Sequence, residues 1–290
     1  MNTHHVYDKY NTENYSKSAH IRCECVKTLL KRHGSELQWE NIKHCIDVGC
    51  GIGDVTKQCF LPLLPRNFKQ LLCTDASPKM LEAARSRLHD VENVDFLEMD
   101  IGASLKDDHV KGVFDRFVSS FCIMYVRDQR KVFENVFELL APGGDCFIIL
   151  FSTGAIFEAF FQLMDTPKWK DKLKRFREVF VFPYREDPDP KGTIEGLLKS
   201  TGFTDILVKT DDFEFTFPTA DKYKDSQQSF PEFPNNMTEK DKYELLQDQV
   251  ELMKSFNLID EFRDETKPIS ESFFKILIVS AKKPLIQKNK

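Results

Sequence analysis

The sequence predicts an α/β fold built on a doubly wound, mostly parallel sheet. Strand-like and helix-like patterns alternate from residue 44 to residue 151, and such alternation is typical of parallel strands joined by right-handed helical crossovers. In addition, the apolar segment 44–48 leads directly into Gly49, Gly51 and Gly53, and a helix-like pattern follows. A strand, a glycine turn and a helix in this order predict a nucleotide-type site.

The elements up to residue 151 are expected from the spacing of apolar residues and from cap and turn signals. Ser77 is a suitable N-cap and Pro78 a suitable first helical residue. Pro62 and Pro65 are expected to end the helix after the glycines, and the turn at 142–144 leads into a fifth strand. The expected strands are 44–48, 69–74, 94–99, 114–121 and 146–151, and the expected helices are 18–33, 55–64, 78–88 and 130–140.

Beyond residue 151 the pattern is less regular. Helices are expected at 155–164, 193–200 and 239–262, with Gly202 ending the second, and strands at 203–217 and 273–281. Residues 218–238 are expected to form a loop. We interpret residues 1–290 as a single domain with an N-terminal cover at 1–35, a cofactor-binding core at 40–152, and two insertions, 152–190 and 216–262, that form a lid.

Composition narrows the function classes. Hydrophobic residues make up 41% of the 290 residues, enough for a full core, and Phe alone occurs 26 times. The net charge of −5, with basic and acidic residues intermixed, gives no indication of nucleic-acid binding. The eight cysteines form no CxxC pair and lack zinc spacing, so no metal is expected. Free buried thiols, a polar N-terminus and no apolar run of membrane-spanning length predict a cytoplasmic protein.

The glycine turn itself separates two ligand classes. A dinucleotide site needs GxGxxG, but the pattern here is GxGxG, and Asp54 stands where the last glycine should be. A carboxylate at that position would repel a pyrophosphate. A ligand without phosphates that carries a cationic centre and an amino-acid tail fits better, and S-adenosyl-L-methionine (SAM) has both.

Two further acids are expected at the same edge of the sheet. Asp75 closes the second strand and can accept both hydroxyls of a ribose. Asp100 closes the third strand and can accept from an adenine amino group, while the Ile101 amide can serve a ring nitrogen. Alone, Asp75 could be a helix cap and Asp100 a solvated turn residue; in this order with the glycines they predict a site. The expected cofactor-binding residues are Asp47, Gly49, Cys50, Gly51, Gly53, Asp75, Ala76, Met80, Asp100, Ile101, Ser119 and Ser120.

Four segments of the chain resemble the class I SAM-dependent methyltransferases. They are IDVGCGIGDVT, LLCTDASPKMLEAAR, VDFLEMDI and LLAPGGDCFIIL, and together they span roughly residues 40–152. The resemblance implies a Rossmann-like fold with a seven-stranded, mostly parallel sheet and a reversed last strand. It also implies SAM as the cofactor and S-adenosyl-L-homocysteine as its product.

A narrower resemblance runs along nearly the whole chain. VYDKYN, FDRFVSSFCIMYVRDQRKVFENVFELL, PGGDC, TPKW and FPYREDPDP are similar to the juvenile hormone acid O-methyltransferases of arthropods. That family methylates the carboxylate of farnesoic acid, of juvenile hormone acid and, in some members, of other fatty acids. The chain departs from the family where His-Trp is replaced by Met124-Tyr125, and where Asn14 is the nearest counterpart of a carboxylate-binding Gln.

Methyl transfer from a sulfonium to a carboxylate needs no general base, because an aliphatic carboxylate is already ionised at pH 7. The protein must align the oxygen, the methyl group and the sulfur, and exclude water. Neutral amide or phenol donors can hold a carboxylate without quenching its reactivity. Asn14 and Tyr125 are therefore the expected catalytic residues, and His20 is a weaker candidate.

An apolar substrate tail would need an apolar channel. The residues expected to line it are Phe121, Met124, Tyr125, Phe157, Phe160 and Phe161, together with the helix 239–262. Three alternatives remain open, because the cofactor motifs say nothing about the acceptor. They are a methyltransferase acting on a small amine or other metabolite, a SAM-binding protein without catalysis, and, more remotely, an NAD oxidoreductase.

Overall fold

The computed structural model describes residues 12–35, 37–174, 177, 180–217, 237–255 and 269–285. Seven strands in this part of the chain form one sheet in the order β3-β2-β1-β4-β5-β7-β6. The strands are β1 His44–Val48, β2 Gln70–Asp75, β3 Val94–Glu98, β4 Phe114–Ser120, β5 Leu140–Gly154, β6 Thr204–Phe217 and β7 Ile269–Lys282. β7 runs antiparallel to both of its neighbours, and β1 to β5 are parallel. The predicted mostly parallel sheet with a reversed last strand is confirmed.

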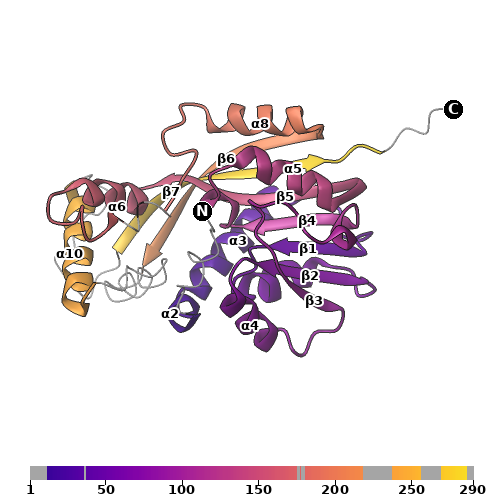
Figure 1. Cartoon of the computed structure of the whole chain (residues 1–290), viewed down its shortest axis with the longest axis horizontal. Helices are drawn as coiled ribbons and strands as arrows, with labels where there is room; N and C mark the ends of the chain where they lie inside the picture. The colour runs from indigo at the N-terminus through magenta and orange to yellow at the C-terminus, as the bar shows by residue number, and fades with distance from the viewer. Residues whose placement is uncertain are drawn as a thin grey trace.

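Helices lie on both faces of this sheet (Figure 1). The described helices are α2 Thr12–Lys17, α3 Ala19–His33, α4 Pro78–Arg87, α5 Gln129–Leu139, α6 Ala155–Asp165, α8 Pro190–Thr201 and α10 Glu239–Ser255. Short helical turns are η1 Thr56–Phe60, η2 Leu61–Leu63, η3 Asp108–Val110 and η4 Ile123–Tyr125. None of the described helices has the length and apolar character needed to cross a membrane.

Two separate hydrophobic cores result from the alternation of side chains along the strands. In β1, Ile46 belongs to the core beneath α5 and α8, whereas its neighbour Cys45 belongs to the core beneath α3 and α4. Both faces of β1 are covered, so its residues from Cys45 to Val48 are all buried, Asp47 included. The glycine turn at the end of β1 is therefore fixed from both sides.

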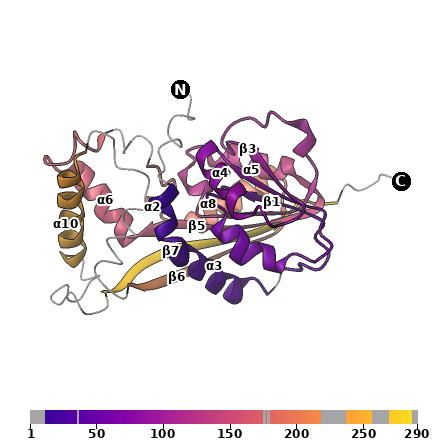
Figure 2. The same cartoon turned by 90° about the horizontal axis from the view of Figure 1, so that it is seen from below.

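Beyond the parallel half, β6 and β7 extend past the other strands (Figure 2). At that end α6 packs beside α10 (Figure 1). The helix predicted over 239–262 is observed over Glu239–Ser255, and residues 256–262 lie outside the described part of the chain. Most of the loop predicted at 218–238 also lies outside it.

Two predicted elements differ in form. The single helix expected at 55–64 is a π-helical turn, η1, followed by the 3₁₀ turn η2, because Pro62 has no N–H to continue the ladder. The turn expected at 142–144 lies inside β5, which begins at Leu140. There Gly143, at φ 84°, donates its N–H to the carbonyl of Lys283 over 2.9 Å, so the turn is an irregularity within the sheet.

The cap signals are confirmed. Ser77 accepts a hydrogen bond from the Met80 N–H at 3.4 Å and precedes Pro78, the first residue of α4. Gly202 ends α8 in the left-handed region at φ 107°. That helix begins at Pro190, earlier than predicted, because Asp189 caps it by accepting from the Gly192 N–H at 3.0 Å.

Candidate functional site

The glycine turn that follows β1 forms the base of the site. Gly49, Gly51 and Gly53 all have positive φ angles, 74°, 56° and 78°. A side chain on Gly49 would place its Cβ 2.1 Å from the Cys122 Sγ, so the backbone can approach the end of β4 only because the residue is glycine. Gly53 makes a similar close approach to Ala84 of α4, at 3.3 Å. The turn is thus held between β4 and α4.

Asp75 lies at the end of β2 and is bound to this turn. Its Oδ2 accepts the Gly51 N–H at 2.9 Å, and its Oδ1 accepts the Ser77 N–H at 2.9 Å. Burial raises the pKa of Asp75 to about 6, although the backbone hydrogen bonds lower it in part. Each oxygen keeps a second lone pair, so the carboxylate can still accept from two vicinal hydroxyls. The geometry agrees with the predicted contact to a ribose, and the contact itself stays a prediction.

Asp47 adds a second buried acid beneath the turn. It is 2% exposed and accepts a hydrogen bond from the Thr56 hydroxyl at 2.6 Å. Burial, together with the negative charges of Asp75 and Asp54, raises its pKa to about 7, although the hydrogen bond from Thr56 lowers it in part. Three carboxylates therefore gather around the glycines, and a cationic ligand would relieve their mutual repulsion.

The segment after β3 carries Asp100 and Ile101. The Asp100 Oδ1 accepts the Gly102 N–H at 2.9 Å, and Ile101 is buried. Sequence reasoning missed Asn135 of α5, whose amide donates to the carbonyls of Ile101 at 2.7 Å and Ala103 at 2.6 Å. A polar residue among the apolar residues of that helix was the available signal. Asn135 fixes the loop on which the predicted adenine contacts depend.

The end of β4 closes the site from the other side. Ser119 is buried, and its hydroxyl donates to the carbonyl of Val48 at 2.8 Å, so it ties β4 to β1. Ser120 follows it and is partly buried. Phe121 has a φ of 53° and stacks on Phe151 with 4.4 Å between the ring centroids. The chain thus turns sharply into η4, which carries Met124 and Tyr125.

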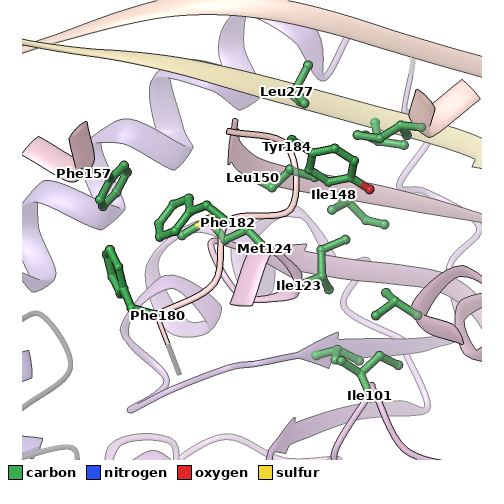
Figure 3. Packing of buried hydrophobic residues seen from close by; sticks show 14 of the residues in the cluster. Ile101, Ile123, Met124, Ile148, Leu150, Phe157, Phe180, Phe182, Tyr184 and Leu277 are labelled. Carbon is green, nitrogen blue, oxygen red and sulfur yellow. The ribbon is translucent and has the colours of Figure 1, made fainter. Parts of the chain in front are cut away.

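An aromatic cluster surrounds η4. The Tyr125 ring lies 5.6 Å from Phe182 and 6.3 Å from Phe180, and burial raises its pKa. The ring centroids of Phe157 and Phe182 are 4.4 Å apart, and Figure 3 shows the Phe182 ring between Phe157 and Met124. Phe161 lies 5.5 Å from Phe180, so the structure brings the predicted lining residues together. Phe160 joins the same cluster.

Three members of this cluster were missed by the sequence reasoning, namely Phe180, Phe182 and Tyr184. They precede or fall within the FPYREDPDP segment, which has no helical or strand period, so the resemblance was the only signal there.

Two N-terminal residues, Asn14 and His20, were predicted to hold the acceptor carboxylate. Asn14 lies in α2, and its side chain is outside the described part of the structure. His20 is exposed, so the structure does not bring it into the buried site. Instead, Tyr15 lies against the glycine turn: a Cβ on Gly51 would be 3.5 Å from its hydroxyl oxygen. Among the described residues no group of three His, Cys, Asp or Glu side chains could hold a metal ion.

Comparisons with known proteins agree with this geometry. A family model described as "Methyltransferase domain" matches residues 46–146. Juvenile hormone acid O-methyltransferase of Bombyx mori is 27% identical over 94% of this chain and 97% of the relative. The protein of the same name from Drosophila melanogaster is 26% identical over 93% of this chain and 91% of the relative.

Solved structures share the fold. Phosphoethanolamine N-methyltransferase 2 of Haemonchus contortus, in complex with SAM, superposes with a TM-score of 0.58 at 18% identity. The match covers 95% of this chain but only 58% of that longer chain. The YcgJ protein of Bacillus subtilis gives a TM-score of 0.58 at 16% identity, over 90% of this chain and 99% of the other.

The strand order, the acid-lined glycine turn and the domain match converge on one class of enzyme. The protein is a SAM-dependent methyltransferase with a class I fold, similar along almost its whole length to the juvenile hormone acid O-methyltransferases.

Proposed function

We propose that this enzyme esterifies the carboxylate of a hydrophobic acid, such as farnesoic acid, juvenile hormone acid or a fatty acid. The observation that carries the proposal is the extent of the similarity. The family model covers only residues 46–146, whereas the two insect relatives match more than nine-tenths of the chain. The similarity therefore includes α6 and the aromatic segment, which lie outside the family model and which we propose to face the acceptor.

The residues around the glycine turn fit SAM. Asp75 would hold the ribose, Asp100 and the Ile101 amide the adenine, and the buried Asp47 the cationic end of the ligand. The remaining predicted cofactor contacts follow the ends of β1 and β2, close β4 or lie in the first turn of α4; they are Cys50, Ala76, Met80, Ser119 and Ser120. When bound, SAM supplies an electrophilic methyl group on a positively charged sulfur.

On the acceptor side the protein supplies apolar surface and neutral donors. The rings of Phe157, Phe161, Phe180 and Phe182 suit a hydrocarbon tail and exclude water. Tyr125, whose pKa is raised by burial, keeps its phenol protonated at pH 7 and can donate to a carboxylate oxygen. Held in this way, that oxygen would accept the methyl group, and the sulfur would keep the electron pair of the broken carbon–sulfur bond. Alignment of this kind can lower the barrier by roughly 7–11 kcal/mol.

The test is a competition among matched acceptors. The full chain is incubated with methyl-labelled SAM and a set of compounds that share one apolar tail but end in a carboxylate, an alcohol or an amine. We expect label in an extractable methyl ester of the acid alone. Label on the amine, or on no member of the set while SAM still binds, would overturn the proposal.

The proposal also gives a role to three segments outside the cofactor-binding core. We propose that residues 1–35 cover the cofactor and that 152–190 and 216–262 form a lid over the acceptor. Support comes from the described parts of those ranges: α2 lies against the glycine turn through Tyr15, and α6 packs against α10.

A further inference from the structure

Tyr15, the neighbour of the predicted Asn14 on α2, lies against the glycine turn. The ring of Tyr15 lies directly above the glycine turn: a Cβ on Gly51 would be 3.4 Å from its Cε1 and 3.5 Å from its hydroxyl oxygen. Gly51 is also the residue whose N–H binds Asp75. The phenol therefore lies at the meeting point of the predicted cofactor site and the N-terminal cover.

The same phenol lies close to the acceptor side. Tyr15 and Cys122 are near enough to Tyr125 that their charges would raise its pKa further, beyond the effect of burial. The Tyr15 phenol of α2 therefore lies within electrostatic range of the Tyr125 phenol of η4. Two neutral O–H donors are suited to the two oxygens of a carboxylate.

Arg22 of α3 holds the Tyr15 ring in place. Its guanidinium lies 3.7 Å from the ring centroid, and its Nη2 donates to the carbonyl of Tyr15 at 3.0 Å. The same Nη2 donates to Asp54 at 2.8 Å, and Nη1 donates to the Ser18 hydroxyl at 2.5 Å. Asp54, on the turn itself, is 2% exposed. The ion pair fastens the cover to the glycine turn and balances the arginine charge.

This arrangement presents the phenol, not the guanidinium, to the site. An arginine paired with an acceptor carboxylate would stabilise the ground state and reduce its reactivity. Burial raises the pKa of Tyr15 to about 12, and the nearby Arg22 lowers it only in part. The phenol therefore remains a hydrogen-bond donor across the physiological pH range.

We infer that the Tyr15 hydroxyl binds the acceptor carboxylate together with Tyr125, and that Arg22, held by Asp54, is a positioning residue that acts through Tyr15. The inference rests on the proposed function, because it presupposes an acidic acceptor. It replaces Asn14 by Tyr15 as the N-terminal group that contacts the substrate.

The first test removes one oxygen atom. Tyr15→Phe keeps the ring beneath Arg22 and loses the donor. We expect kcat/KM for the acid that wild type methylates to fall 10- to 100-fold, mainly through KM, while the Kd for SAM measured by calorimetry stays within twofold. Ser200→Ala is the matched control, since it also removes one oxygen atom, from an exposed residue of α8 outside the site and the proposed lid, and should leave all constants unchanged.

The outcomes distinguish a failure of the proposed function from a failure of the role inferred for Tyr15. If wild type methylates no acid, the proposed function fails before the variant is considered. If wild type is active and Tyr15→Phe retains its kcat/KM, or weakens SAM binding instead, the inference is overturned. A loss on Asn14→Ala without a loss on Tyr15→Phe would return the role to Asn14.

The second test asks whether Arg22 acts through Tyr15. Because a lone buried Asp54 could unfold the chain, Arg22 and Asp54 are changed together, to Gln and Asn. We expect R22Q/D54N to raise KM for the acid about as much as Tyr15→Phe does, and to add less than twofold when combined with it. Multiplicative losses would mean that Arg22 acts independently of Tyr15, and would overturn the positioning role.

Discussion

The hydroxyl of Tyr184 donates a hydrogen bond of 2.9 Å to the Oε1 of Gln129, and both residues are buried. The Nε2 of Gln129 donates in turn to the carbonyl of Ile123, the first residue of η4, at 2.8 Å and to that of Val126, which directly follows η4, at 2.6 Å. One side-chain amide therefore connects the turn that carries Tyr125 to the segment that carries Phe182. The acceptor side of the site is held together by a polar network inside an aromatic cluster.

Tyr184→Phe is expected to loosen η4. The substitution leaves the Gln129 Oε1 buried without its donor, which costs about 1–3 kcal/mol of unfolding free energy. Because η4 carries Tyr125, kcat/KM for the acid acceptor should fall, whereas the Kd for SAM should not change. Urea unfolding and calorimetry measure the two quantities, and an unchanged unfolding free energy would mean that the hydrogen bond contributes nothing.

Much of the cofactor side of the site could be predicted from the sequence, because local rules fix it. Glycines at alternate positions after an apolar strand need positive φ angles, and Asp75 followed by Ser77-Pro78 is both a strand end and a helix cap. The carboxyl ends of parallel strands then bring Asp75 and Asp100 to one edge of the sheet whatever the rest of the chain does.

The acceptor side could not be predicted in the same way, because its geometry depends on packing between distant segments. Asn14 and Tyr15 are adjacent in the sequence, and adjacent positions on a helix are about 100° apart, so sequence alone does not decide which position faces the turn. Phe180 and Phe182 come from a segment without a regular period. Only tertiary contacts place them against Phe157.

Gly49→Ala and Gly112→Ala test the close approach at the glycine turn. Both residues have nearly the same φ, 74° and 70°, so each alanine costs about 1–2 kcal/mol of backbone strain. A Cβ on Gly112 meets nothing within 4 Å, whereas one on Gly49 lies 2.3 Å from the Cys122 Cβ. We therefore expect Gly49→Ala to lose markedly more unfolding free energy and to abolish SAM binding, while Gly112→Ala retains it.

Removing the opposing side chain sharpens that comparison. Cys122→Gly deletes the two atoms, Sγ and Cβ, that would clash with a Cβ on Gly49, so it should be less harmful in the Gly49→Ala background than in wild type. Equal effects of Cys122→Gly in the two backgrounds would show that the steric contact is not the reason for glycine at this position.

The raised pKa values of Asp47 and Asp75 predict proton release when SAM binds. With pKa values of about 7 and 6, both acids are partly protonated in the free enzyme at pH 6. A cationic ligand favours their charged forms, so binding should expel protons at pH 6 and few at pH 8, and affinity should decrease as the pH falls from 8 to 5. The dependence of the binding heat on the ionisation enthalpy of the buffer measures this release, and a buffer-independent heat at pH 6 would contradict it.

The same shifts have a consequence for the stability of the free enzyme. Folded-state pKa values above the unfolded value of about 3.9 mean that the folded form binds more protons between pH 4 and pH 7. These two groups therefore reduce stability as the pH rises through that window. Asp47→Asn, which can still accept from Thr56, should raise the melting temperature at pH 8 more than at pH 5 while weakening SAM binding.

The contact between Trp169 and Asp248 tests whether α10 belongs to an acceptor lid. The buried Trp169 donates its Nε1–H to the Asp248 Oδ2 at 2.6 Å, and Lys168 pairs with both Asp248 and Glu244. Asp248→Ala leaves the indole N–H without its acceptor and should release α10, at a cost of about 1–3 kcal/mol. Glu244→Ala removes only the solvent-accessible ion pairs of Glu244 with Lys168 and Lys240, each worth at most about 1 kcal/mol.

If α10 closes over the acceptor, the two variants should therefore differ. Asp248→Ala should raise amide hydrogen exchange in 239–255 and raise the KM for the acid, without changing the Kd for SAM, because the glycine turn lies on the parallel half of the sheet. Glu244→Ala should leave all three close to wild type. Faster exchange in Asp248→Ala with an unchanged KM would mean that the Trp169 contact stabilises the helix but that α10 does not act as a lid.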